Sequence, residues 1–76
     1  LCSSYCVQIG AYREPANAKL MLQQASLLDM PAFLHHSRRL VHVLVGPYAD
    51  RARAGQIQTR LAGTGMHGFV RLFEDR

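Results

Sequence analysis

The sequence predicts an α+β domain with the element order β-α-β-β-α-β, the ferredoxin-like or RNP-like arrangement. In this arrangement a four-stranded antiparallel sheet carries both helices on one face. The main observation behind this expectation is a loose internal duplication at a shift of 36 residues, which places Val7 on Val43. In each copy, a stretch with strand-like alternation precedes a stretch with helical spacing. The other repeated pairs are Gly10 and Gly46, Tyr12 and Tyr48, Ala16 and Ala52, Ala18 and Ala54, Met30 and Met66, and Phe33 and Phe69.

The first unit spans about residues 5–36. Alternation over residues 5–11 predicts a strand that ends at Gly10 and Tyr12, and its core-facing side chains are expected to be Tyr5, Val7, Ile9 and Ala11. A helix is expected to begin at Glu14-Pro15, because Pro is favoured at the first helical position. Its apolar stripe is Ala18, Met21, Leu22, Ala25 and Leu28. Asp29 and Met30-Pro31 end the helix, and residues 32–35 form a short second strand.

The second unit spans about residues 40–73 and follows a polar hairpin turn at residues 37–39. Residues 40–45 alternate as a strand, with Val41, Val43 and Val45 inward and Leu40, His42 and Leu44 outward. Gly46-Pro47 is expected to turn the chain, and Asp50 to cap the next helix. The stripe of that helix is Ala54, Ile57 and Leu61, weakened by Gly55, and residues 63–65 end it. In the last strand, residues 68–73, Val70 and Leu72 point inward, and Phe69, Arg71 and Phe73 outward.

Composition indicates one small globular domain. The chain has 76 residues, is 49% hydrophobic and carries a net charge of +4. We expect residues 1–4 to be a flexible flank, residues 5–73 the domain and residues 74–76 a tail. No segment is long enough to span a bilayer, and no signal peptide is visible, so we expect no direct membrane insertion by this segment. The basic charge weakly favours an anionic partner.

The two cysteines leave their own state open. On one extended strand the Cα atoms of Cys2 and Cys6 would be about 13 Å apart, whereas a disulfide requires less than about 7 Å. They could pair only if the chain bends back before Tyr5.

The sheet face without helices is the candidate binding surface. Alternation places Cys6, Gln8, Phe33, His35, Leu40, His42, Leu44, His67, Phe69 and Arg71 on it. Rings beside hydrogen-bonding groups suit a ligand with flat apolar faces and hydroxyl edges, or a stacked base. Gln8 is the most specific feature, because its amide can donate and accept at once. Equally, these side chains could pack on one another as an amphipathic sheet surface.

Two motifs resemble those of the SPOR domain (sporulation-related repeat). The first is Tyr5-Cys6-Val7-Gln8-Ile9-Gly10-Ala11-Tyr12 followed by Asn17-Ala18, and the second is Val43-Leu44-Val45-Gly46-Pro47-Tyr48-Ala49 followed by Ala54 and Leu61. They are similar to the family's V-Q-[hydrophobic]-G-[AS]-[aromatic] first strand and R-V-x-V-G-P-[aromatic] third strand, and the resemblance covers about residues 5–73. The chain departs from the pattern at His42, where the family usually has arginine, and at Leu44, which is often polar; it also contains no tryptophan.

The resemblance implies a non-catalytic module that binds bacterial peptidoglycan, in particular denuded glycan strands without stem peptides. It would direct a larger exported or membrane-anchored protein to the division septum, in the periplasm or cell envelope. It implies glycan binding on the open sheet face, with Gln8 prominent. The expected glycan-binding residues are Gln8, Phe33, Leu40, His42, Leu44, His67, Phe69 and Arg71. We expect no cofactor, and a monomer.

Other functions have less support in the sequence. RNA recognition modules share this element order, but the outward positions of the two central strands, among them Gln8 and His42, carry no aromatic residue here, so we expect no nucleic-acid partner. We see no serine or cysteine in a strand-to-helix elbow for nucleophilic catalysis. A zinc site from Cys2, Cys6 and His35 or His36 matches no common spacing, so we expect no metal site. A protein–protein module that uses the same sheet face remains open.

Overall fold

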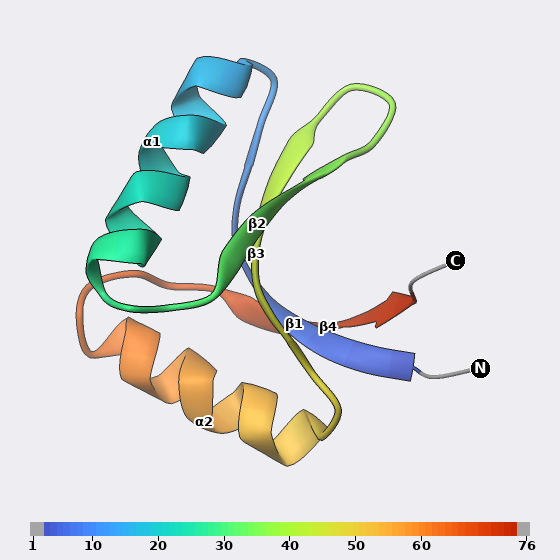
Figure 1. Ribbon diagram of the computed structural model, residues 1–76, viewed down its shortest axis with the longest axis vertical. Coiled ribbons are helices and arrows are strands. Elements are labelled where there is room, and N and C mark those ends of the chain that lie inside the picture. Colours follow the sequence, from blue (N-terminus) through green and yellow to red (C-terminus); the bar gives the residue numbers. More distant parts are fainter. Residues whose placement is uncertain (1–2, 75–76) are drawn as a thin grey trace.

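The computed structural model describes residues 3–74 and confirms the expected α+β architecture. The elements are β1 (Ser3–Tyr12), α1 (Pro15–Leu27), β2 (Ala32–His36), β3 (Val41–Tyr48), α2 (Arg51–Ala62) and β4 (Phe69–Glu74). The strands form one antiparallel sheet in the order β2-β3-β1-β4. Both helices cover the same side of this sheet, and the first and last strands, β1 and β4, lie side by side (Figure 1). The other side of the sheet is free of helices.

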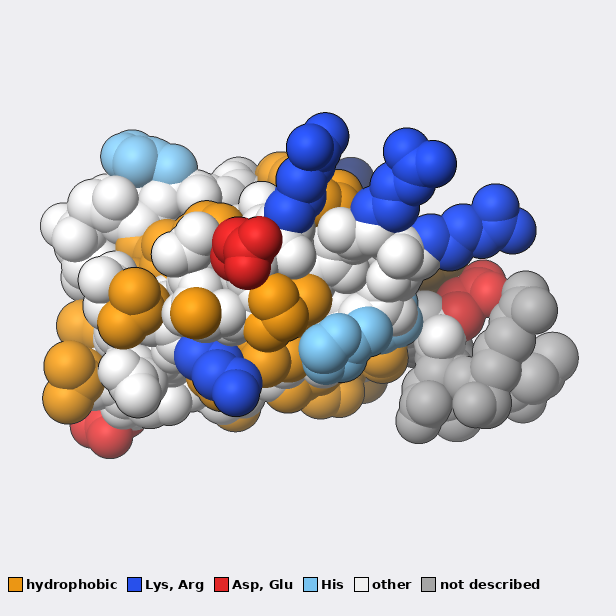
Figure 2. All heavy atoms as spheres, turned by 90° about the horizontal axis from the view of Figure 1, so that it is seen from above, with side chains coloured by type: hydrophobic (Ala, Val, Ile, Leu, Met, Phe, Trp, Pro, Cys, Tyr) orange, Lys and Arg blue, Asp and Glu red, His pale blue; other side chains and the backbone are white. Residues whose placement is uncertain are grey.

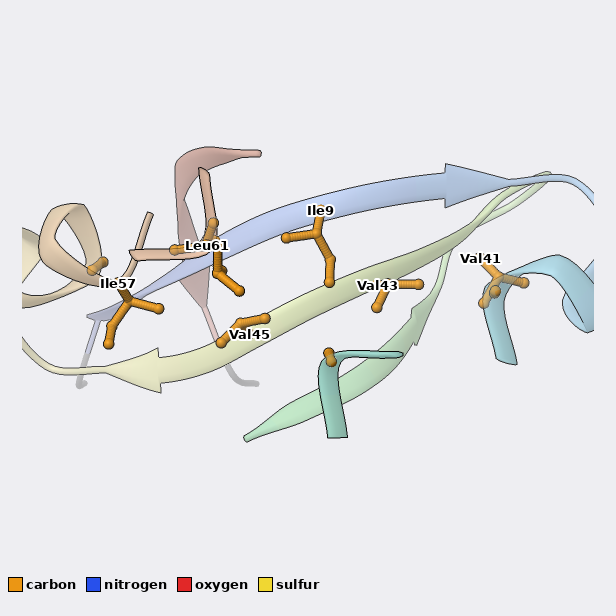
Figure 3. Packing of buried hydrophobic residues seen from close by; sticks show 10 residues of the cluster. Ile9, Val41, Val43, Val45, Ile57 and Leu61 are labelled. Carbon is orange, nitrogen blue, oxygen red and sulfur yellow. The ribbon is translucent and has the colours of Figure 1, made fainter. Parts of the chain in front are cut away.

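The core lies between the sheet and the two helices. Its strand side consists of Val7, Ile9, Val41, Val43 and Val45, which are all buried, as the alternation predicted. The helix side is supplied by Ala18 and Ala25 of α1 and by Ala54, Ile57 and Leu61 of α2. These side chains interdigitate across the layer (Figure 3). The paired alanines, 18 with 54, allow each helix to lie close to the sheet.

The two helices end in the same way, which reflects the duplication. After α1, Met30 N–H donates to the Ala25 carbonyl and Asp29 N–H to that of Ser26. After α2, Met66 and Gly65 donate in the same pattern to Leu61 and Ala62. Each is a Schellman motif, whose penultimate residue requires a positive φ. Gly65 takes φ +88°, and Asp29, at the equivalent position, takes φ +58°.

The helix starts follow the sequence-based expectations. Pro15 occupies the first turn of α1, and the carboxylate of Asp50 accepts a hydrogen bond from Ala52 N–H at 2.9 Å at the start of α2. Leu28 is 37% exposed, so it lies at the margin of the stripe to which it was assigned.

The expected inward direction of Ala11 is wrong. The register of β1 against β3 shifts between Gln8 and Gly10, so that Gly10 lies opposite Val43 and Ala11 opposite His42. A bulge of this kind reverses the alternation beyond it, and Ala11 is exposed. Tyr12 instead packs against the core, with its ring over Gly10, where a Cβ would come within 2.6 Å of it.

Several element boundaries also differ from expectation. β3 does not end before Gly46-Pro47 but continues to Tyr48 through the cis Gly46-Pro47 peptide. β1 begins at Ser3 and β4 includes Glu74, so residues 3, 4 and 74 belong to the sheet rather than to flanking segments.

Leu72, expected inward, lies on the helix side opposite Tyr5 but is 48% exposed. Cys2 lies outside the described residues, and Cys6 is a buried free thiol.

Candidate binding face of the sheet

The side of the sheet without helices forms one continuous surface, here called the open face. The register places Gln8 opposite Phe69 on one side and Leu44 on the other, and Leu44 opposite Phe33. Neighbouring pairs are Cys6 with Arg71, Ser4 with Phe73, and His35 with His42. The open face therefore consists of Ser4, Cys6, Gln8, Ala11, Phe33, His35, His42, Leu44, Phe69, Arg71 and Phe73.

Two members of this face form its buried floor. Leu44 and Cys6 are both fully buried, although neither belongs to the core cluster on the helix side. Burial raises the pKa of the Cys6 thiol, with the Arg71 charge acting weakly in the opposite direction. Leu44, which the family resemblance placed among the glycan-binding residues, has no solvent-accessible surface in this structure. It lies beneath the side chains that form the surface of the open face.

An aromatic cluster also lies on the open face. The Phe73 ring meets the Phe33 ring edge-on, with centroids 5.4 Å apart, and the His35 ring at the same distance. Phe73 lies on β4, whereas its two neighbours lie on β2, at the opposite edge of the sheet. The twist of the sheet brings these edges together on this face. Alternation placed Phe73 outward, but no sequence pattern indicated this contact, and Phe73 was not among the expected site residues.

Gln8 and Arg71 form the polar centre of the face. The Arg71 guanidinium donates through Nη1 to Gln8 Oε1 at 2.8 Å, and both side chains are half-buried. They come from neighbouring strands, since β1 and β4 are paired here. Phe69 lies directly opposite Gln8 and is 54% exposed, so its ring is accessible from solvent. The structure thus brings three of the expected residues into one patch.

His42 is a half-buried ring on the open face. Its Nε2 lies 3.1 Å from Ser37 Oγ, and its Nδ1 is buried without a hydrogen-bond partner among the described residues. Burial lowers the pKa of His42 below its ordinary value of 6.5, and the charges of Arg71 and His35 lower it further. These effects all favour the neutral form of the imidazole.

Two expected residues lie away from this patch. Leu40 precedes β3 in the hairpin turn, where its carbonyl accepts from Ser37 N–H at 2.9 Å. His67 precedes β4 and is exposed, outside the paired part of the strand. Phe33 and His42 belong to the open face, although the Phe33 ring is partly covered by Phe73.

The open face combines apolar and hydrogen-bonding groups. It offers an accessible ring, an amide and a guanidinium over an apolar floor, and none of its residues is acidic. Within residues 3–74, no cluster of His, Cys, Asp and Glu is suited to hold a metal ion. Neither described helix has the length and apolar character needed to cross a membrane. Basic side chains also project elsewhere, side by side along one margin of the surface in Figure 2, so positive charge is not confined to the open face.

A split βαβ sheet with helices on one side and an accessible, ring-bearing face on the other defines a small ferredoxin-like module. Residues 3–72 match the SPOR domain, and the chain belongs to this family, as its two motifs indicated. Its fold is similar to the solution structure of the peptidoglycan binding domain of the B. subtilis cell wall lytic enzyme CwlC, with a TM-score of 0.89 and 24% identity over 97% of this chain and 94% of that one. No curated protein matches the chain significantly.

Proposed function

We propose that this domain binds peptidoglycan through its open face, recognises glycan strands that lack stem peptides, and itself catalyses no reaction. The observation that carries the proposal is the match to the SPOR domain over nearly the whole described chain. The similar fold of a domain described as peptidoglycan-binding supports the same ligand. We further propose that binding directs a larger envelope protein to the division septum, where denuded strands would be its target.

The open face suits such a ligand in its chemistry. The accessible ring of Phe69 offers an apolar surface against which a sugar ring can stack. Gln8 and Arg71, next to it, can hydrogen-bond to the substituents at the sugar's edge. Leu44 and Cys6 lie beneath this patch and are fully enclosed, so a ligand would meet the side chains above them.

Co-sedimentation with purified sacculi tests the proposal. The domain is spun with intact sacculi, with sacculi treated with an amidase to remove stem peptides, and with sacculi whose denuded strands have then been digested. We expect binding to increase after the first treatment and to fall after the second. Binding that ignores both treatments would contradict the proposal and point to a protein partner or to charge-driven adhesion.

Variants locate the site within the same assay. Gln8→Ala and Phe69→Ala should each weaken binding while the domain stays folded, because both side chains are partly exposed. Leu27→Ala is the matched control, since Leu27 is 85% exposed on α1 and lies on the opposite side of the molecule. Equal loss in all three variants would remove the open face from the proposal. A fluorescent fusion of the domain in dividing cells, with and without Gln8→Ala, tests septal recruitment.

A further inference from the structure

The Gln8–Arg71 pair has a chemical consequence for the ligand. Arginine has donors but no acceptor, so only the oxygen of the Gln8 amide can face the guanidinium at 2.8 Å. The Gln8 nitrogen is therefore turned away from Arg71. An isolated glutamine could present either end of its amide to a ligand, whereas this one presents N–H groups.

The remaining groups around the pair add donors and few acceptors. Arg71 keeps guanidinium N–H groups beyond the one given to Gln8. On His42, one ring nitrogen faces Ser37 and the other is buried. Ser4 Oγ donates to the Phe73 carbonyl at 3.0 Å. No carboxylate lies on this face to neutralise Arg71, so the patch favours a ligand group that accepts several hydrogen bonds and is negatively charged.

We propose that Arg71 fixes Gln8 as a donor, and that the pair reads the free lactyl carboxylate of N-acetylmuramic acid in a denuded strand. This inference rests on the proposed function and names the ligand group behind it. In a strand with stem peptides the same carboxyl is an amide, which is neutral and has one oxygen instead of two. Removal of the peptide thus creates a charged acceptor that the Gln8–Arg71 pair can bind. Selectivity for denuded strands then depends on the charge of this carboxylate as well as on steric exclusion of the stem peptide.

The first experiment changes the ligand and leaves the protein intact. Soluble denuded glycan oligomers are compared with the same oligomers whose lactyl carboxylates have been converted to methylamides. We expect the methylamide form to bind at least about tenfold more weakly, as is typical when a charge-assisted hydrogen bond is lost, and binding of the acid form to decrease with added salt. Equal binding of both forms would overturn the inference and leave peptidoglycan binding intact. Absence of binding to either form would overturn both proposals.

Variants then assign the effect to the two residues. Arg71→Gln should bring the ratio between acid and methylamide forms close to one, whereas Arg71→Lys, which keeps the charge, should retain part of it. Gln8→Glu should bind less than Gln8→Ala, because it removes the donor and places a negative charge against the carboxylate. Arg60→Gln and Gln24→Glu make the same charge changes on exposed helix positions and should leave the ratio unchanged. A ratio in Arg71→Gln equal to that of the unaltered domain would assign the recognition elsewhere.

An NMR titration gives a readout that a purely structural role of Arg71 would not produce. The Arg71 charge contributes to the lowered pKa of His42. A ligand carboxylate bound at Arg71 should therefore raise the pKa of His42, and the methylamide form should raise it less. An identical response to both ligands would contradict a carboxylate at this position.

Discussion

Replacement of Asp29 by glycine is expected to stabilise the domain. Asp29 occupies the left-handed position of the Schellman motif after α1, at φ +58°, where a side chain is unfavourable. The equivalent residue in the second unit is Gly65, at φ +88°. A left-handed conformation costs a residue with a Cβ roughly 1–2 kcal/mol. Glycine avoids this cost, but its greater conformational entropy in the unfolded chain lowers the gain in stability by about 0.4–1 kcal/mol. Asp29→Gly should thus raise the unfolding free energy by about 0.5–1 kcal/mol.

Urea denaturation of a reciprocal set of variants measures this effect. Gly65→Asp should lower the unfolding free energy by about 1 kcal/mol, and the cost is conformational because a Cβ at Gly65 meets no atom within 4 Å. Asp29→Asn separates the backbone effect from that of the negative charge at a helix C-terminus, which the helix dipole disfavours. The dependence on urea should be the same in all variants. If Asp29→Gly lowers the stability, or Gly65→Asp leaves it unchanged, the equivalence of the two helix ends is refuted.

Three further outcomes are expected. Leu44→Ala should cost about 2–5 kcal/mol of stability because the side chain is fully buried, yet glycan affinity per folded molecule, measured by titration, should stay within about twofold; a specific loss of affinity would make Leu44 a contact residue. Gly55→Ala should raise the melting temperature through a gain of about 0.5–1 kcal/mol, since a Cβ there meets nothing within 4 Å; a lower melting temperature would contradict this. The folded state disfavours protonation of His42, so the unfolded chain takes up more protons as the pH falls through 6.5 and stability decreases. The unfolding free energy of His42→Gln, measured by urea denaturation at each pH, should decrease less between pH 8 and pH 5 than that of the unaltered domain. The same decrease in both proteins would refute the lowered pKa.

The sequence predicted those features of the fold that repeat along the chain. Alternation identified Val41, Val43 and Val45 as core residues, and helical spacing identified Ala54, Ile57 and Leu61. Each of these patterns depends on a single helix or strand, which buries one of its sides in the core. The duplication supplied the rest, because two equal units had to share one sheet.

What the sequence did not predict depends on how strands lie relative to one another. The bulge that turns Ala11 outward is set by the pairing of β1 with β3, and no residue within β1 predicts it. Leu44 was correctly placed on the open face, but its complete burial follows from side chains on other strands. The hydrogen bond of Arg71 to Gln8 joins residues 63 positions apart and required the register of β1 with β4.

The ring contact of Phe73 with Phe33 and His35 joins the two edge strands of the sheet, which share no backbone hydrogen bonds. β2 and β4 are its two edge strands and are separated by β3 and β1, yet on the open face their side chains touch. One strand comes from each half of the duplication, so this contact also ties the two halves together on the side away from the helices. Rings from both edges of the sheet thus occupy this corner of the open face, whereas Phe69, opposite Gln8, is 54% exposed. A polymer that lies on this sheet would accordingly have one favoured course over it.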